Sequence, residues 1–291
     1  MKQDILARKL ERIDDLPSIP SMVFEAVHLL HQPDITVERL TSSIQLDQAI
    51  VSKKLRLVNS SFYGFQGRIG NLSQALVLLG FNAVRNAILS ISILDIFSDL
   101  GKDFDSRLFW LHAIGTGVIC QVIGHQLKYP RVENLFVAGL LHDIGKLVII
   151  KLFPEDFFKI LKEVREKDIS IIEAERAVLG MDHTEIGYRM AEKWKLPQEI
   201  QEALGFHHCP WNAKENRAMS ATVCVSNCLC RALDIGCGGD ALVPEIDPKV
   251  LTILGIEPLF IAGCLEDIDL EMERAKSFLT IFNENELRSP S

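Results

Sequence analysis

A histidine and an aspartate stand side by side in one of the most apolar stretches of this chain. They are His142 and Asp143 of "LLHDIGK", which follows "ENLFVAG" and precedes "LVII". Burying these two side chains without partners would cost several kcal/mol. They are therefore expected to be paired with each other, hydrogen-bonded to the backbone, or bound to a metal ion.

Histidine is otherwise scarce, with eight residues in a chain of 291. Besides His142, four lie at positions that can converge in a bundle: His112 in "LFWLHAIG", His183 at the start of "HTEIGYRM", and His207 and His208 at the end of "IQEALGFHH". A helix interior, a helix start and a helix end can share one pocket. Imidazole nitrogens with one carboxylate suit Fe, Mn, Zn or Co(II) rather than Ca or Mg, and Asp143 could bridge two ions.

A second interpretation stays open at this point. A buried histidine is more often a hydrogen-bonded core residue than a metal ligand. The candidates are also far apart in the sequence, so their spacing is not the signature of a compact zinc site. Spacing alone therefore does not decide between a metal site with one or two ions and a set of ordinary core histidines.

The segments that must position these residues have the apolar periodicity of helices, and strand-type alternation is nearly absent. We predict one helix over residues 106–127, which carries His112, and another over 132–153, which carries His142 and Asp143 in its interior. Two apolar helices are expected to hinge near Gly80. The fold class is therefore predicted to be all-α, a multi-helix bundle.

Composition narrows the classes of partner. The hydrophobic fraction is 48%, the charged fraction is 24%, and the formal net charge is -8 with a pI of about 5.5. This balance argues against a broad basic surface for nucleic acid or for an anionic membrane. The small cationic cluster Lys53, Lys54 and Arg56 is interpreted as a solvated helix face.

The cysteines and the N-terminus indicate a reducing, cytoplasmic setting. The seven cysteines are unevenly spaced and do not form a disulfide framework, and Cys224, Cys228 and Cys230 are interpreted as buried thiols rather than metal ligands. The opening "MKQDILARKLERIDDLP" has charges where a signal peptide needs an apolar core. No uninterrupted apolar run reaches the length of about 18 residues that a membrane span needs.

Several motifs in order carry a family resemblance. "WLHA", "LLHDIGK", "MDHTEIGYRMAEKWKLP" and "GFHH" resemble the HD superfamily, whose helical domains bind divalent metals and often hydrolyse phosphoesters. The upstream segments "LPSIPSMVFEAVHLL", "LTSSIQLDQAIVSKKLRLVNSSFYG" and "NLSQALVLLGFNAVRNAIL" resemble the N-terminal part of the HDOD family, the HD-related output domains of bacterial signalling proteins. The resemblance covers about Leu16 to Leu229. We predict three parts: residues 1–100 as the N-terminal helical block, 101–235 as an HD-like core, and 236–291 as helices that pack on it.

Carried over position by position, the resemblance implies a set of metal-site residues: His112, His142, Asp143, His183, His207, His208 and Asn227. Asn227 stands where ordinary HD enzymes have an aspartate, and an amide oxygen is a weaker ligand; Asp234, two turns further on, is the alternative. If the protein is an enzyme, Asp143 and Lys146 would be catalytic, with Lys146 facing a substrate phosphate.

Two departures bear on activity. The cyclic di-GMP phosphodiesterases called HD-GYP carry a Gly-Tyr-Pro segment between "HDIGK" and the next histidine, and this chain has none. Those that bind three metals also have a glutamate one turn before the first histidine, where Leu108 stands. These departures favour a signalling module, non-catalytic or weakly catalytic, that acts through other signalling proteins.

Two alternatives remain from the sequence. The first is a metal-dependent phosphohydrolase acting on a phosphoester or a cyclic nucleotide, in which the retained ligands would hold a water-activating ion. The second is a purely structural metal site, for which five or six ligands exceed the usual four. A nucleotide or phosphoester is a candidate ligand.

Overall fold

The fold is known from a computed structural model that describes residues 72–97, 100 and 104–286. Their helices are α5 (Leu72–Ile96), α6 (Ser106–Gln126), α7 (Val132–Leu141), α8 (Ile144–Leu152), α9 (Pro154–Lys167), α10 (Ile171–Leu179), α11 (His183–Lys193), α12 (Gln198–Phe206), α13 (Arg217–Ala232), α14 (Pro248–Leu254), α15 (Pro258–Gly263) and α16 (Leu265–Glu286), with a short 3-10 turn at Pro210–Asn212. These residues contain no strand, which confirms the predicted all-α class.

The chain divides into two compact units, and the metal-site candidates all belong to the first. Among the described residues, this first unit covers Leu100–Ile268, from before α6 into the start of α16. The second contains α5 and the rest of α16. Within α5, Gly80 has a non-helical backbone (φ 82°, ψ 165°), so the expected hinge is present.

Some predictions from the sequence concern residues that the structure does not describe, or are not tested by it. The N-terminal helices before residue 72, and the cluster Lys53, Lys54 and Arg56, lie outside the described residues. The division into residues 1–100, 101–235 and 236–291 remains a prediction.

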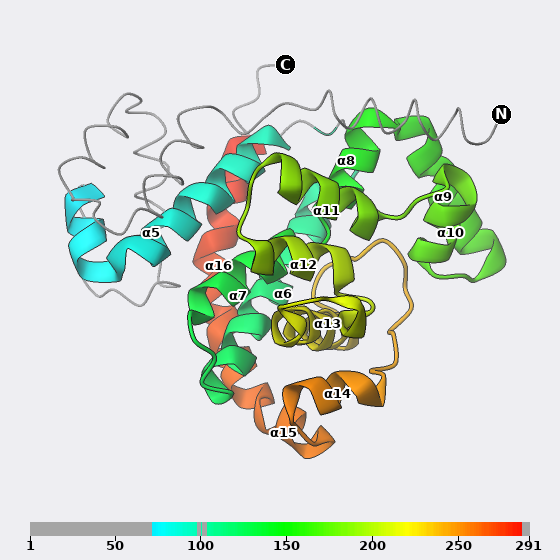
Figure 1. Ribbon diagram of the computed structural model, residues 1–291. Coiled ribbons are helices and arrows are strands. Elements are labelled where there is room, and N and C mark those ends of the chain that lie inside the picture. Colours follow the sequence, from blue (N-terminus) through cyan, green and yellow to red (C-terminus); the bar gives the residue numbers. More distant parts are fainter. Residues whose placement is uncertain (1–71, 98–99, 101–103, 287–291) are drawn as a thin grey trace. The chain divides into compact units, whose positions relative to one another are not determined.

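The core of the first unit forms around α6, α7 and α13, which pack against one another (Figure 1). Their apolar residues supply fully buried side chains such as Ile114, Leu135 and Val223. Each large apolar side chain removed from water contributes about 1.5–3 kcal/mol. Helices α11 and α12 pack as a pair and connect this core to α8, while α9 and α10 pair with each other.

The prediction of one long helix over residues 132–153 is wrong at one point, which matters for the site. The chain leaves helical structure at a turn formed by His142 and Asp143, so that α7 ends before the turn and α8 begins after it. His142 is the C-cap of α7 and Asp143 the N-cap of α8. Neighbours within one helix point about 100° apart, because a turn takes 3.6 residues. Here the break lets both side chains reach one centre.

Helix α6 is the one described helix long and apolar enough to cross a membrane by length and composition, with a mean hydropathy of 1.3. In the protein, 78% of that segment is buried, as in a core helix. All seven cysteines are described and free, so no disulfide framework is present, as expected.

Candidate metal centre

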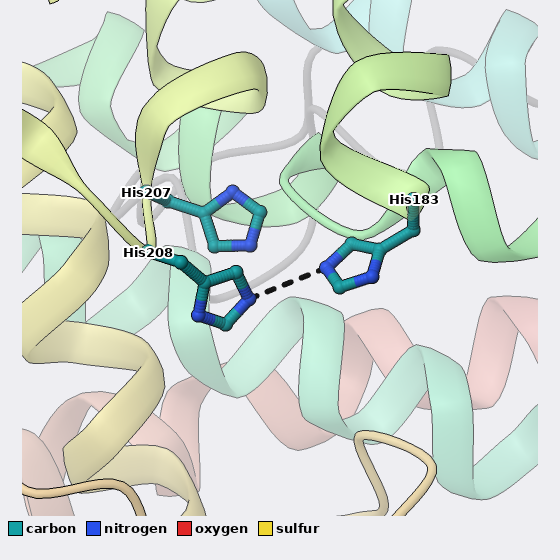
Figure 2. A group of neighbouring side chains, drawn as sticks. All are labelled: His183, His207 and His208. Carbon is teal, nitrogen blue, oxygen red and sulfur yellow. Dashed lines mark hydrogen bonds between the residues drawn. The ribbon is translucent and has the colours of Figure 1, made fainter. Parts of the chain in front are cut away.

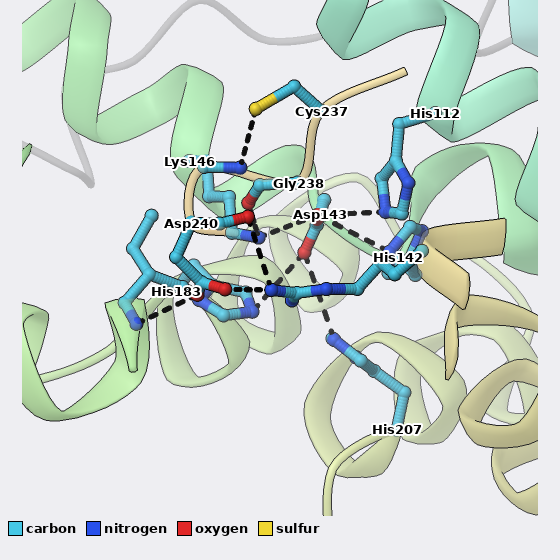
Figure 3. Close-up of polar contacts among 12 residues, drawn as sticks. His112, His142, Asp143, Lys146, His183, His207, Cys237, Gly238 and Asp240 are labelled. Carbon is cyan, nitrogen blue, oxygen red and sulfur yellow. Dashed lines mark hydrogen bonds and ion pairs between the residues drawn. The ribbon is translucent and has the colours of Figure 1, made fainter. Parts of the chain in front are cut away.

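The carboxylate of Asp143 lies at the centre of the predicted site, and four histidines surround it (Figure 3). Its Oδ2 is 3.3 Å from Nε2 of His142 and 3.8 Å from Nε2 of His112. Its Oδ1 is 3.2 Å from Nε2 of His183 and 3.8 Å from Nε2 of His207. The histidines come from α6, the α7–α8 turn, α11 and the end of α12, so the structure brings together residues far apart in sequence.

A hydrogen bond from Nδ1 fixes the orientation of three of these rings. The Nδ1 atom of His142 donates to the carbonyl of Gly139 (2.7 Å), and Nδ1 of His207 donates to the carbonyl of Leu204 (3.0 Å). A carbonyl can only accept a hydrogen bond, so Nδ1 carries the proton and Nε2 keeps its lone pair. Both rings therefore present a metal-binding nitrogen toward the aspartate.

The third ring held in this way is that of His183, whose partner is a buried carboxylate. Nδ1 of His183 donates to Oε2 of Glu175 at 2.7 Å, and the backbone N–H of His183 donates to the same oxygen at 2.9 Å. A carboxylate behind a histidine fixes the ring and makes its other nitrogen a stronger ligand. Sequence reasoning missed Glu175; the only available signal was an acidic residue in the otherwise apolar face of "SIIEAERAVLG".

The close approach of α8 and α11 depends on Gly145. A Cβ at this position would overlap the backbone carbonyl of His183. Only glycine therefore allows the first turn of α8 to lie directly against the first turn of α11. Asp182 fixes the latter turn: its Oδ1 caps α11 by accepting from the N–H groups of Thr184 (2.9 Å) and Glu185 (3.2 Å).

His208 lies beside His207 and extends the cluster next to His183 (Figure 2). Its Nε2 lies 3.3 Å from Nε2 of His183. Two ligands at ~2.0–2.1 Å from one ion in tetrahedral geometry lie about 3.3–3.4 Å apart, so this spacing fits a shared ion. The ligand atoms thus form two groups, one of His183, His207 and His208 and the other of His112, His142 and Asp143.

Burial sets the charge of these groups. Desolvation, with His142 nearby, lowers the pKa of His112 to about 3. Desolvation and neighbouring histidines also hold the pKa values of His207 and His208 well below the usual range. Burial opposes ionisation of Asp143, but His142 and Lys146 outweigh it and keep the pKa of this carboxyl well below its ordinary value. Imidazole nitrogens beside one carboxylate form a donor set suited to a divalent transition metal.

Several inward-facing atoms have no hydrogen-bond partner among the described residues: Nε2 of His112, Nε2 of His142, Nε2 of His207 and Oδ1 of Asp143. All four side chains are at most 1% exposed. An unsatisfied buried polar group costs about 1–3 kcal/mol, and several pointing at one another would add repulsion between lone pairs. An ion at this position would satisfy them together, so the donors present fit a metal.

Lys146 points into the same centre and is itself buried. Its Nζ donates to Oδ2 of Asp143 at 2.7 Å and to the carbonyl of Gly238 at 2.6 Å. The lysine that the resemblance assigned to a substrate phosphate is therefore engaged by the protein on two sides.

The remaining candidates do not join the cluster in the same way. Asn227 is buried on α13 and its Oδ1 has no hydrogen-bond partner among the described residues, but no ion pair or hydrogen bond joins it to the histidines. Its role as a ligand remains a prediction. Asp234, the alternative, is exposed after the end of α13 and belongs to neither group of ligand atoms.

Comparison with known proteins identifies the family and several relatives. The family model described as HDOD domain matches residues 16–210. An uncharacterized protein of Treponema pallidum (strain Nichols) is 27% identical over 252 residues, which cover 85% of this chain and 47% of that protein. The protein YuxH of Bacillus subtilis (strain 168) is 25% identical over 175 residues, 60% of this chain and 39% of its own length. The chain spans less than half the length of these two relatives.

Solved structures share the fold. An HDOD domain protein of unknown function from Geobacter sulfurreducens superposes with a TM-score of 0.73 at 24% identity, covering 97% of this chain and 96% of its own. A protein from Shewanella amazonensis, provisionally named a phosphohydrolase, gives a TM-score of 0.74 at 22% identity over 92% and 97% of the two chains. At these identities the likeness concerns the fold.

Proposed function

Because this chain belongs to the HDOD domain family, we propose that it is a signal-transduction module whose buried histidine–aspartate centre holds one or two divalent transition-metal ions, with little or no catalytic activity of its own. The ligands would be His112, His142, Asp143, His183, His207 and His208. The metal would bind these side chains together and so stabilise the helices that carry them.

The closure of the centre is the observation that carries this proposal. His142, Asp143, His183 and His207 are each at most 1% exposed. His208, another proposed ligand, is partly exposed. Burial of the other ligands limits access of a substrate, whereas a catalytic metal site keeps one coordination position for water or substrate. Lys146, which could pair with a phosphate, is already bonded to Asp143 and to the Gly238 carbonyl.

The partners of the module are expected to be other signalling proteins. A protein from Marinobacter aquaeolei that shares the fold, with a TM-score of 0.74 at 18% identity over 97% of this chain and 66% of its own, is provisionally named a signal transduction protein. Since this chain spans less than half of its curated relatives, input from a further part of a longer protein would be compatible with such a role.

A metal-dependent phosphohydrolase is the second candidate, and Lys146 beside Asp143 is the observation that favours it. A bound divalent metal would lower the pKa of a water molecule and polarise a phosphoryl oxygen. In that case Lys146 would neutralise phosphate charge and Asp143 would hold the metal. A substrate phosphoester or nucleotide would have to reach a centre that is closed in this structure.

Hydrolysis of bis(p-nitrophenyl) phosphate distinguishes the two functions. The protein is purified, loaded with Mn(II), and its metal content is measured before the assay. The module predicts full metal occupancy with turnover equal to that of the Asp143→Asn variant. Turnover that follows metal content and disappears in Asp143→Asn would instead establish the phosphohydrolase.

A further inference from the structure

A short glycine-rich segment covers the centre on the side of His112 and Lys146. It consists of residues 235–240, "IGCGGD", which follow α13 and are called the strap below. The strap lies beyond residue 210, where the match to the HDOD family model ends. Figure 3 shows Cys237, Gly238 and Asp240 of the strap beside Lys146, Asp143 and His112.

Polar contacts attach the strap at three places. The N–H of Cys237 donates to the carbonyl of Leu108 in the first turn of α6 (3.0 Å). The carbonyl of Gly238 accepts from Lys146 (2.6 Å). The carboxylate of Asp240 pairs with Arg231 and accepts from the N–H of Ile171 at the start of α10 (3.0 Å).

The strap lies directly against His112. A Cβ on Gly236 would overlap the backbone N of His112 and the carbonyl of Leu108. A Cβ on Gly238 would be 3.4 Å from Nε2 of His112, the ring nitrogen nearest to Asp143. Gly236 has a φ of +70°, which a side chain disfavours. The seating of the strap therefore depends on glycine in both sterics and backbone conformation.

We propose that the strap is an autoinhibitory cover of the metal centre, and that Lys146 can bind a phosphate-type anion only when the strap is displaced. The proposal rests on the proposed function, since it explains how the centre is kept closed. The Gly238 carbonyl accepts a hydrogen bond from the Lys146 ammonium, which a phosphate oxygen would otherwise accept. Displacement would break this bond and leave Lys146 paired with Asp143 alone.

The strap is suited to moving because only a few polar contacts, to α6, α8, α13 and the start of α10, hold it among the described residues. It has three glycines among six residues, which gain more conformational freedom on release than other residues. The side chain of Cys237, in the middle of the strap, is exposed, while Ile235 at its start lies close to Gly115 of α6. Its release would leave the ligand-bearing helices α6, α8, α11 and α12 in place.

The reactivity of Lys146 toward an amine-acetylating reagent tests the cover directly. Metal-free protein, prepared with a chelator, is treated with an acetyl N-hydroxysuccinimide ester, and modification of each lysine is followed by mass spectrometry. The Gly236→Ala variant cannot seat the strap. The matched control is Gly255→Ala, another glycine of positive φ (+65°) with no atom within 4 Å of its added Cβ. The side chain of Lys162, 70% exposed, serves as the internal reference.

The proposal predicts that acetylation of Lys146, relative to Lys162, is at least tenfold faster in Gly236→Ala than in wild type and unchanged in Gly255→Ala. In the displaced form, inorganic phosphate should slow this acetylation, and in wild type it should not. Two results would overturn the proposal. In the first, Lys146 of folded Gly236→Ala is acetylated at the wild-type rate; in the second, phosphate does not slow the acetylation of Lys146 in this variant. If circular dichroism shows that Gly236→Ala is unfolded, the acetylation rate of Lys146 is measured in Asp240→Ala instead. Its control is Glu245→Ala, which changes an exposed side chain.

The same experiment separates this inference from the proposed function. Labelling is performed without metal, so a protein that binds no metal at all can still show a strap that covers Lys146. If the wild-type protein binds its full metal content but its Lys146 reacts as fast as Lys162, the metal centre is supported and the covering role of the strap is disproved.

Discussion

At the residue scale, the hydrogen-bond partners of the histidine Nδ1 atoms fix the orientation of the ligands. Asp143 faces the Nε2 atoms of the histidines, while Gly139, Leu204 and Glu175 accept hydrogen bonds from the Nδ1 atoms of three of the rings. Glu175 is the one charged group among these supports and is 1% exposed. It should therefore contribute more to metal affinity than a carbonyl in the same position.

Changing Glu175→Gln tests this contribution. The amide keeps the size of the side chain but removes the charge that strengthens Nε2 of His183. We expect a loss of metal affinity of about 10–100-fold, measured by competition with a coloured chelator. Glu173→Gln, two residues earlier on α10 and paired only with Ser170 at the helix start, is the control and should bind metal as wild type does. Equal affinity in the two variants would remove Glu175 from the site.

Asp182 stabilises the start of α11 in a pH-dependent way. Burial opposes its ionisation, but hydrogen bonding from Thr184 and the charge of Arg176 lower the pKa of Asp182 below its usual value. A carboxyl with a lowered folded-state pKa contributes stability above its unfolded pKa of about 3.9, and this stability is lost as the pH falls through the folded-state pKa.

The Asp182→Ala variant should therefore lose about 1–2 kcal/mol of unfolding free energy at pH 7, the usual effect of removing a helix cap. The difference from wild type should shrink below about pH 4, as wild-type Asp182 itself becomes protonated. Urea unfolding of metal-free protein at pH 7 and at pH 3 measures both values. A difference that stays the same at the two pH values would contradict the pKa argument.

At the scale of elements, the site depends on where helices end and how closely they meet. The turn between α7 and α8 lets His142 and Asp143 face one centre. Gly145, two residues later, lets α8 lie against the backbone of His183 in α11. The sequence "HDIGK" thus combines two ligands, a helix start and a close-packing position.

Gly145→Ala should push α8 and α11 apart. An overpacked core position costs about 1–3 kcal/mol, although alanine is otherwise favoured over glycine in a helix. We expect reduced thermal stability together with weaker metal binding, because Asp143 and His183 would separate. Gly263→Ala, in α15 with no atom within 4 Å of the added Cβ, should be neutral or stabilising. A Gly145→Ala protein as stable as wild type, with unchanged metal affinity, would show that this contact does not position the ligands.

At the scale of the whole molecule, the sequence predicts what depends on local pattern. Apolar periodicity predicts the helices, and the glycine at position 80 marks a hinge that the structure contains. The choice of ligands came from residue chemistry and from the order of motifs. The structure places His112, His142 and Asp143 in one group and His183, His207 and His208 in another, and their role as metal ligands remains a prediction.

What the sequence does not predict arises from contacts between distant segments. The break at His142 and Asp143 is hidden because the residues on both sides are apolar and continue a helical pattern. Glu175 resembles any acidic residue of an amphipathic helix until α10 and α11 are seen to meet. The contact between Lys146 and Gly238 joins residues 92 positions apart, and no local pattern indicates it.

Anomalous diffraction from crystals of the metal-loaded protein tests the central claim, that these side chains form one metal centre. We expect an anomalous peak within about 2.0–2.3 Å of Nε2 of His142 and of a carboxylate oxygen of Asp143, and a second ion would give a peak beside His183 and His208. Loaded protein whose only anomalous peaks lie away from Asp143, or whose crystals show none, would contradict the claim.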